Sequence, residues 1–524
     1  LAAHLHALGG EDRADARQER RRLRRMHQQR LGGVAGAVLL RLRVVGDLER
    51  LFQVDLGVDV DVAVAVQVLD DGHLRFGADA LRILRACHDL GLRAAVAYSD
   101  VDRDSLPVRL ADEAICIGPG PAARSYNNIP AVISAALLTG CDAIHPGYGF
   151  LAENPYLAEV CEQVGVTFIG PRPDVIEAMG NKAEARKLMR QAGVPIVPGS
   201  DGPVENLAEA RQVARRINYP LIVKAVAGGG GRGMRGVHDE DELIRALPLA
   251  QAEAEAAFSN GDVYLERYVE QPRHVEVQVL ADEHGSILAV GERDCSIQRR
   301  HQKLIEEAPA PNLPGKTREA LLKAAVKGAK AAGYTNAGTL EFLVDTHGNA
   351  YFMEMNTRIQ VEHPVTEMTT GIDLVAWQIR IAAGQRLSIT QRDCAPQGHA
   401  IECRITAENP ALDFAPSVGT VETYVAPGGP GVRVDSHLYA GYTVPPFYDS
   451  LLGKVIAWGK DRDEAAARME RALTETVITG VPQTVSLLRS IVADDEFRAA
   501  SFDTGFIARH GDRLVLASRS TGGA

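Results

Sequence analysis

The ten residues from Glu354 to His363, with the sequence EMNTRIQVEH, constrain this chain more than any other stretch. Charged and amide side chains occupy the even-numbered positions from 354 to 362, and Met355, Ile359 and Val361 occupy odd ones. In an extended strand, alternate side chains point to opposite faces. The pattern therefore predicts a strand with one apolar face and one face of carboxylates, amides and a guanidinium. An amphipathic edge strand with a solvated polar face would show the same pattern.

Two strands, 340–344 and 350–353, are predicted directly upstream of this stretch, and the turn between them contains His347-Gly348. If these two residues form the loop of a hairpin, Glu341 lies directly opposite Glu354. Like charges in that position are destabilising, and a divalent cation such as Mg²⁺, which prefers oxygen ligands, would remove the conflict. The predicted metal ligands are Glu341, Glu354 and Asn356.

The string from Glu354 to His363 resembles the biotin carboxylase branch of the ATP-grasp enzymes. Other matching strings are HPGYGFLAEN at 145–154, ERDCSIQRRHQK at 292–303 and GHAIECR at 398–404. The resemblance covers roughly residues 80 to 505. It implies an α/β chain with an ATP-grasp fold, made of an N-terminal Rossmann-like domain, a glycine-loop lid domain and a C-terminal domain.

Composition and charge narrow the class of protein. A chain of 524 residues is long enough for two to four domains, and 46% hydrophobic with 24% charged residues is typical of a soluble globular protein. The net charge of −11 argues against a general nucleic-acid binder. Seven scattered cysteines without a C-x-x-C motif indicate reduced thiols in a cytosolic protein. The apolar run at 34–40 is far shorter than the ~20 residues that span a bilayer.

The first 70 residues differ from the rest of the chain. The sequence opens with Leu, residues 11–30 contain eight Arg and no Lys, and 54–66 is a low-complexity run of mostly Val, Asp and Ala. An Arg-rich targeting arm, a native disordered tail and a mis-assigned start or reading frame all fit this composition, and we favour the last. We therefore predict that residues 1–70 are an extension outside the fold. The resemblance is good only from Ala80 onward, so the first strand of the fold is not identified in the sequence.

From residue 81 to about 170, short apolar strands alternate with helices, as in a doubly wound α/β domain. The domains predicted from this pattern and from the resemblance are 71–180 for the N-terminal domain, 181–395 for the ATP-grasp domain with its lid at about 196–268, 396–510 for the C-terminal domain, and 511–524 for a tail.

A glycine run, Gly228–Gly236, follows a predicted strand at 219–225 and precedes a predicted helix at 240–257. A flexible linker would also contain such glycines, but the flanking elements argue against one. The run formally contains G-x-G-x-x-G, yet the helix begins too late for a dinucleotide fold, and no Gly-Lys-Ser/Thr follows for a P-loop. The remaining interpretation is a lid whose backbone amides close over phosphates.

The basic residues Arg299, Arg300 and Lys303 lie directly before the acidic pair Glu306-Glu307. No aromatic residues lie between them, as a surface for single-stranded nucleic acid would require. A phosphate pocket is therefore favoured over a nucleic-acid surface, and an exposed charged turn is the alternative.

The family resemblance implies a role for each matched residue. The implied ATP contacts are Lys182, Lys224, Gly229, Gly230, Gly231, Glu266, His274, Gln298 and His301. Glu341, Glu354 and Asn356 are the implied ligands of Mg²⁺ or Mn²⁺. Bicarbonate is held by Arg358, Gln360 and Val361. Glu362 is the implied base, and Lys303 and Arg404 stabilise the carboxyphosphate and the biotin enolate.

Arg358 and Glu362 cannot both act on one bicarbonate if the strand between them is fully extended. Four residues at strand spacing separate them by roughly 13 Å. If both residues contact the anion, the chain must bend between them. A bend would also bring a backbone amide of Gln360 or Val361 toward the anion.

The implied activity is the ATP- and bicarbonate-dependent carboxylation of biotin on a separate carrier protein, as part of a cytoplasmic acyl-CoA carboxylase for fatty-acid synthesis. The expected partners are a biotin carboxyl carrier protein, a second copy of the chain and a carboxyltransferase subunit, without nucleic acid or membrane. The sequence contains no Met-Lys-Met, so no fused biotinyl domain is expected. Another bicarbonate-using ATP-grasp ligase and a non-catalytic member of the fold are the alternatives.

Overall fold

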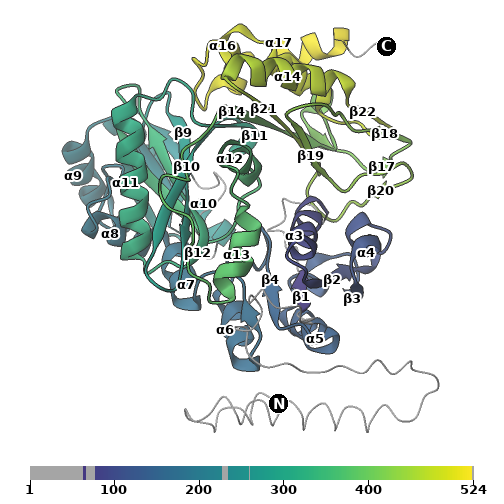
Figure 1. Ribbon diagram of the computed structural model, residues 1–524. Helices are drawn as coiled ribbons and strands as arrows, with labels where there is room; N and C mark the ends of the chain where they lie inside the picture. Colours follow the sequence, from purple (N-terminus) through teal and green to yellow (C-terminus); the bar gives the residue numbers. More distant parts are fainter. Residues whose placement is uncertain (1–62, 67–76, 227–233, 259, 522–524) are drawn as a thin grey trace.

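The computed structural model describes residues 63–66, 77–226, 234–258 and 260–521 (Figure 1). The described part combines helices with both parallel and antiparallel sheets, which confirms the predicted α/β class. None of the described helices is both long and apolar enough to cross a membrane. All seven cysteines are free thiols.

The N-terminal part is a five-stranded parallel sheet in the order β3-β2-β1-β4-β5. Its strands are β1 (Ala63–Val66), β2 (Arg93–Ser99), β3 (Glu113–Gly118), β4 (Ala143–His145) and β5 (Thr167–Phe168). Its helices are α3 (Ala78–Asp89), α4 (Leu106–Leu110), α5 (Ile129–Thr139), α6 (Pro155–Val164) and α7 (Pro173–Gly180), with the short turns η2 (Asp100–Asp102) and η3 (Ala122–Arg124). Alternation of strand and helix produces this doubly wound layer, as the sequence predicts.

The prediction that residues 1–70 lie outside the fold is wrong for Ala63–Val66. These four residues form β1, the central strand of the parallel sheet, where Ala65 pairs with both Ala95 and Ile144. The Val-rich alternation suits a strand, but the low-complexity composition around it concealed this signal. The other positions of the predicted extension lie outside the described residues.

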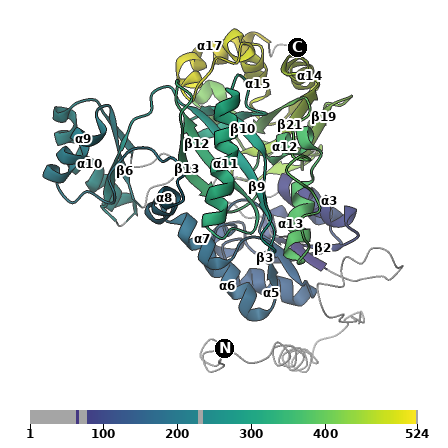
Figure 2. The ribbon, with the colours of Figure 1, turned by 60° about the vertical axis from the view of Figure 1, so that its left-hand side comes forward.

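The predicted lid is a separate lobe, which Figure 2 shows with α9, α10 and β6 to one side of the molecule. Its antiparallel sheet has the order β7-β6-β8, formed by β6 (Leu221–Ala225), β7 (Met234–Val237) and β8 (Val263–Arg267). The helices α9 (Leu207–Ile217) and α10 (Glu240–Phe258) pack on this sheet around their own apolar cluster. Gly229, Gly230 and Gly231, predicted to cover the phosphates, lie outside the described residues.

An eight-stranded antiparallel sheet, in the order β13-β12-β9-β10-β11-β14-β21-β19, joins the predicted ATP-grasp and C-terminal domains. Its strands are β9 (Arg273–Ala281), β10 (Ile287–Arg299), β11 (Gln302–Ala308), β12 (Asn336–Val344), β13 (Ala350–Asn356), β14 (His399–Thr406), β19 (Val432–Ser436) and β21 (Leu451–Gly459). Because β11 pairs directly with β14, side chains from both domains meet on one continuous sheet.

Helices pack against this sheet, and the strand residues that do not pack against α11 form its polar face. They are α8 (Lys182–Gln191), α11 (Gly315–Ala331), α12 (His363–Thr370), α13 (Leu374–Ala382), α14 (Arg462–Glu475), α15 (Val485–Val492), α16 (Asp495–Arg498) and α17 (Phe506–Thr521). Val275, Val277 and Val279 of β9 pack in one cluster with residues of α11. The alternate residues of β9 therefore point to the opposite face, where polar side chains gather.

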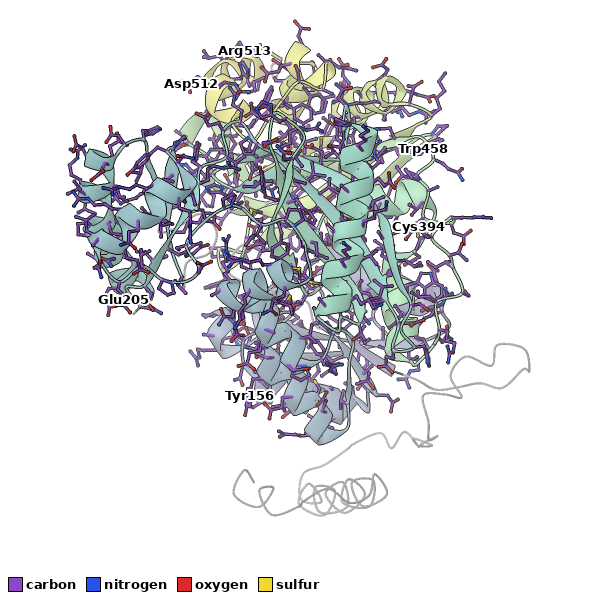
Figure 3. All side chains as sticks on the ribbon, turned by 90° about the vertical axis from the view of Figure 1, so that its left-hand side faces the viewer. Tyr156, Glu205, Cys394, Trp458, Asp512 and Arg513 are labelled. Atoms are coloured by element: carbon purple, nitrogen blue, oxygen red, sulfur yellow. The ribbon has the colours of Figure 1, made fainter. Side chains whose placement is uncertain are left out.

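Short elements complete the C-terminal part. They are β15 (Glu408–Asn409) paired with β16 (Ala415–Pro416), β17 (Gly419–Thr420) paired with β20 (Thr443–Val444), β18 (Thr423–Val425) paired with β22 (Val477–Thr479), and η4 (Pro410–Leu412). Figure 3 helps to place the three parts: Tyr156 lies in the N-terminal part, Glu205 in the lid lobe, and Asp512 and Arg513 in α17 of the C-terminal part.

The β12–β13 hairpin has the predicted pairing but a different loop. Glu341 lies opposite Glu354, as predicted, yet the last pair before the turn is Val344 with Ala350, so the loop is longer than two residues. The Asp345 carboxylate accepts the backbone N–H groups of residues 347 and 349, which stabilises the longer loop. A register shift directly after Glu341 then restores the predicted pair.

The predicted strand through His363 is wrong beyond Asn356, where β13 ends. Residues 357–362 leave the sheet, and α12 begins at His363 with a proline in its first turn. The backbone N–H of Thr357 donates to Glu153 of the N-terminal part instead of to a neighbouring strand (2.8 Å). The chain between Arg358 and Glu362 is therefore not extended.

Candidate active site

A row of charged residues crosses the polar face of the large sheet. Arg293 of β10 lies opposite Glu276 of β9, which lies opposite Glu341 of β12, and Glu341 lies opposite Glu354 of β13. Directly opposed carboxylates repel each other. The repulsion predicted between two glutamates thus extends over three strands.

Lys303 of β11 offsets part of this negative charge. Its ammonium group donates to Glu276 (2.7 Å), Glu341 (3.0 Å) and Glu362 (2.6 Å). Burial alone would lower the pKa of Lys303, but these three carboxylates hold it well above its usual value. Lys303 therefore carries a fixed positive charge at the centre of the site.

Glu362 precedes α12 and lies between two cations. Its carboxylate accepts hydrogen bonds from Lys303 and from the Nη2 atom of Arg404 (2.9 Å). Burial opposes ionisation, but Lys303, Arg404 and the nearby Arg293 hold the pKa of Glu362 well below its usual range. The predicted base is consequently ionised at neutral pH, as a proton acceptor must be.

Arg404 of β14 connects Glu362 to a second glutamate. Its Nε atom donates to Glu306 of β11 at 2.5 Å, while Nη2 reaches Glu362. The guanidinium fork can bind two oxygen atoms at once. The two carboxylates therefore fix its plane.

The segment predicted to hold bicarbonate forms hydrogen bonds with both the ATP-grasp domain and the C-terminal domain. Gln360 donates to Glu341 (2.8 Å), and the carbonyl of Val361 accepts a hydrogen bond from Lys454 of β21 (2.6 Å). Arg358 instead donates through Nε to Glu153 (3.0 Å). Gln360 and Glu362 thus meet Glu341 and Lys303, whereas Arg358 lies between Glu153 of the N-terminal part and Asn356, to whose side-chain oxygen it donates (3.2 Å).

The three predicted metal ligands do not all contact one another. Asn356 donates to Glu341 (3.0 Å), and His274 of β9 lies 3.0 Å from the same carboxylate. Glu354 is paired with Lys182 at 3.5 Å. Within the described ranges, the groups of three or more His, Cys, Asp and Glu side chains close enough to hold a metal ion are His274–Glu276–Glu341 and Glu276–Cys295–Glu362, and neither contains Glu354. Here Lys303 and His274 relieve the predicted repulsion at Glu341.

A second group of predicted ATP residues lies where the lid lobe meets the sheet. Lys224 of β6 contacts Glu266 of β8 at 2.5 Å, and Arg186 of α8 pairs with the same carboxylate. Burial, followed by the charges of Lys182 and Arg186, lowers the pKa of Lys224 to about 8. An ammonium group with this pKa is close to losing its charge, and an added anion would restore it.

Of the remaining predicted ATP residues, His274 and Gln298 lie on strands of the large sheet, and His301 lies in the turn between β10 and β11. His274 is buried, and the Glu341 and Glu276 carboxylates outweigh its desolvation and raise its pKa. Gln298 of β10 pairs across the sheet with Lys303. His301 occupies the β10–β11 turn in a left-handed conformation (φ 69°), where desolvation and Lys224 lower its pKa.

Sequence reasoning missed four residues that organise the site: Glu276, Arg293, Glu306 and Glu153. Glu276 shares its parity with His274 and Gln278 in a strand of valines, and that pattern could have revealed it. Glu153 and Arg293 lie within the matching strings at 145–154 and 292–303, but their partners, like that of Glu306, come from distant elements that no local pattern reveals. Arg293, for example, donates to Glu276 at 2.5 Å and lies fully buried.

Three family models match the chain in order. They are described as biotin carboxylase, N-terminal domain (residues 75–176), carbamoyl-phosphate synthase L chain, ATP binding domain (181–390), and biotin carboxylase C-terminal domain (402–509). The biotin carboxylase of Nostoc sp. is 54% identical over 431 residues, which cover 82% of this chain and 96% of that protein. The chain belongs to the biotin carboxylase family. Biotin carboxylase 1 of Bacillus subtilis is 55% identical over 432 residues, again with 82% and 96% coverage.

Solved structures agree with the family assignment. A biotin carboxylase–β,γ-ATP complex from Campylobacter jejuni has a TM-score of 0.81 and 46% identity, with 86% of this chain and 98% of that chain covered. The biotin carboxylase domain dimer of Hydrogenobacter thermophilus 2-oxoglutarate carboxylase, with MgADP, ADP and bicarbonate, has a TM-score of 0.80 and 48% identity over 86% and 98%. The ATP-grasp fold predicted from the sequence is thereby confirmed.

Proposed function

We propose that this chain catalyses the ATP- and bicarbonate-dependent carboxylation of biotin on a carrier protein. The observation that carries the proposal is the buried carboxylate of Glu362, which accepts hydrogen bonds from Lys303 and Arg404. This arrangement lies in a chain that covers 96% of the length of two biotin carboxylase relatives and is more than half identical to them over the shared residues.

ATP binds between the lid lobe and the large sheet. The triphosphate is negatively charged. Lys182 and Lys224 supply positive charge there, and His301 does so when it is protonated. The proposed ATP residues are Lys182, Lys224, Gly229, Gly230, Gly231, Glu266, His274, Gln298 and His301. The depressed pKa of Lys224 supports this placement, because a bound anion stabilises its charged form.

Glu341, Glu354 and Asn356 suit Mg²⁺ or Mn²⁺ by their chemistry. All three offer hard oxygen atoms, and Glu341 and Glu354 are directly opposed on neighbouring strands. When bound, the metal ion neutralises phosphate charge during transfer. The chain's own contribution is to hold three acidic side chains in one row: Glu276, Glu341 and Glu354.

Bicarbonate binds beside Gln360, Val361 and Arg358, within reach of Lys303 and Arg404. In the first step, Glu362 accepts the bicarbonate O–H proton, and the resulting oxygen attacks the γ-phosphorus. The bond from the γ-phosphorus to ADP breaks, and carboxyphosphate forms. Because an anion would share the charge of Lys303 and Arg404, it would also weaken their hold on Glu362 and raise the basicity of that carboxylate.

Lys303 and Arg404 then stabilise the carboxyphosphate and the biotin enolate as the carboxyl group moves to biotin. Catalysis of this kind depends on positioning and on charges fixed before the reaction. The three hydrogen bonds of Lys303 and the two of Arg404 to carboxylates fix those charges.

The partners belong to the same proposal. The dimer named for the Hydrogenobacter thermophilus structure supports a homodimer. Relatives named biotin carboxylase support a biotin carrier protein as a further partner, and a carboxyltransferase subunit is proposed as the partner that uses the carboxylated carrier. The acceptor is proposed to be an acyl-CoA that feeds fatty-acid synthesis, although a pyruvate carboxylase subunit of Methanothermobacter thermautotrophicus is also 53% identical. Seven free thiols favour the cytoplasm.

Biotin dependence tests the proposal. ATP turnover by the purified chain should require bicarbonate and rise when free biotin or a biotinylated carrier is added. Bicarbonate-dependent turnover that ignores biotin would favour another ligase, in keeping with the carbamoyl-phosphate synthase name of the central family model. No turnover under any of these conditions would favour a non-catalytic member of the fold.

A further inference from the structure

Two glutamates face each other next to the proposed active site; the proposed mechanism uses Glu306 only as a partner of Arg404 and does not use Glu402. Glu306 of β11 and Glu402 of β14 are direct cross-strand partners. Both side chains are completely buried. Their side chains therefore share one face of the sheet, on the same side as Arg404, two residues along β14.

The two carboxyl groups have different partners. Glu306 accepts a hydrogen bond from the Nε atom of Arg404 through Oε1. Among the described residues, neither oxygen of Glu402 has a hydrogen-bond partner, nor has the second oxygen of Glu306. An ionised carboxylate buried without a partner is strongly destabilising. Two such charges directly opposite each other would be worse.

The groups around Glu402 are Lys454 of β21, Arg404 on its own strand, Glu306 of β11, Glu362 before α12 and Tyr148 of the N-terminal part. The two cations are already engaged. Arg404 holds Glu306 and Glu362, and Lys454 donates to the carbonyl of Val361. Neither cation donates a hydrogen bond to Glu402 in the described structure.

We propose that Glu306 and Glu402 form a carboxyl pair that carries one proton at neutral pH, located on Glu402, and that this pair positions Arg404 against Glu362. Ionised Glu306 holds Nε, and neutral Glu402 leaves the rest of the guanidinium to Glu362 and the substrate. Burial, together with the neighbouring acidic groups, raises the pKa of both carboxyls, in agreement with a shared proton. The pair is a positioning device, since neither member contacts a reacting atom.

The proposal has a consequence at alkaline pH. If Glu402 ionises, a third carboxylate competes for Arg404, which lies on the same face two residues away. Arg404 would then be withdrawn from Glu362, and turnover would fall. This effect rests on the proposed function, but the protonation state of Glu402 does not.

Infrared spectroscopy measures the protonation state directly. The wild-type minus Glu402→Gln difference spectrum at neutral pH should contain the C=O band of a protonated carboxylic acid. Glu307→Gln is the matched control, because Glu307 follows Glu306 in β11 and is also buried. Burial would raise the pKa of Glu307, but His399 and Arg462 lower it to about 2. Its difference spectrum should show only carboxylate bands. A carboxylate band in the Glu402→Gln spectrum would overturn the proposal.

Turnover measures the positioning role. Glu402→Gln keeps the size and neutrality of the protonated acid, so biotin-dependent turnover at pH 7 should stay within about twofold, and its alkaline limb should move to higher pH. Glu306→Gln should lower kcat at least about tenfold, as for a charge-assisted hydrogen bond lost beside the base, with the KM for ATP within about twofold.

Equal losses in the two variants, without a shift of the pH profile, would reduce the pair to a structural role and contradict the proposal. A Glu402→Gln chain that fails to fold would contradict it too, because an amide should replace a neutral acid. If the wild type has no biotin-dependent turnover, the proposed function fails, and the infrared result still decides on the pair.

Discussion

The two ends of the site are held in different ways. At the lid end, Lys182 and Glu354 lie 3.5 Å apart, with side chains 33% and 37% exposed. At the base end, Lys303 and Glu362 lie 2.6 Å apart, with side chains 12% and 2% exposed. An exposed ion pair contributes at most about 1 kcal/mol, whereas a buried charge that loses its partner costs several.

The difference indicates which contacts can change when substrate binds. Water can replace either partner of the Lys182–Glu354 pair, so ATP and a metal ion can separate them at little cost. Lys303 cannot leave its carboxylates without another anion to take their place. We therefore expect the base end to be organised before substrate arrives, and the lid end to be completed by the nucleotide.

The largest effect should come from removing the central ammonium group. Lys303→Met leaves Glu276, Glu341 and Glu362 without their shared cation and should lower the free energy of unfolding by about 3–5 kcal/mol at pH 7. The matched change Lys182→Met should lower it by less than about 1 kcal/mol. Urea denaturation of both variants would measure the contrast, and equal losses would show that the two ends do not differ.

The next effect concerns turnover. Glu362→Gln removes the proposed proton acceptor and should reduce kcat at least about a hundredfold, within the range for a lost general base. ATP affinity should change little, because the hydrogen bonds that Glu362 accepts come from Lys303, Arg404 and the Cys295 thiol, none of which is a proposed ATP residue. Steady-state kinetics in varied bicarbonate would measure it.

Glu354→Gln is the comparison variant at the lid end. It should weaken the use of MgATP, with a higher KM for ATP and a changed metal requirement, and should affect kcat less than Glu362→Gln does. Near-normal turnover in Glu362→Gln would assign the base to another residue. Unchanged metal dependence in Glu354→Gln would remove this residue from the metal site.

The smallest effect is a pH dependence at the lid end. The pKa of Lys224 is lowered to about 8, so its ammonium group loses its charge as the pH rises through that value. The kcat/KM for ATP, which reports the free enzyme, should therefore fall above about pH 8. Lys303, whose pKa is raised, stays charged over this range. A fall that persists unchanged in Lys224→Arg would exclude Lys224 as its cause.

Local patterns in the sequence predicted much of the fold. The Glu341–Glu354 pair was predicted from a two-residue hairpin loop at His347-Gly348, and the incorrect loop length did not change the pair because a register shift compensates. Low-complexity composition concealed β1. The end of β13 at Asn356 could not be predicted, because the contact between Thr357 and Glu153 joins residues 204 positions apart.

The site shows the same contrast between local patterns, which the sequence reveals, and contacts between distant residues, which it does not. Its individual residues could be named from motifs, but their partners could not. Lys303 contacts carboxylates from β9, β12 and the residue before α12, and only the register of the sheet brings these together. In the sequence, Glu306 is simply a charge that follows a basic patch, and its contact with Arg404 depends on the pairing of β11 with β14.

Oxygen transfer from bicarbonate to phosphate tests the central claim most directly. If the base end activates bicarbonate as a nucleophile toward ATP, turnover with ¹⁸O-labelled bicarbonate must place one labelled oxygen in each phosphate released. The label should appear at the same ratio with the wild type and with any residual turnover of Glu354→Gln. Phosphate that forms in step with biotin carboxylation but without label would contradict the account, because the γ-phosphoryl group would then have been transferred to water or to another acceptor.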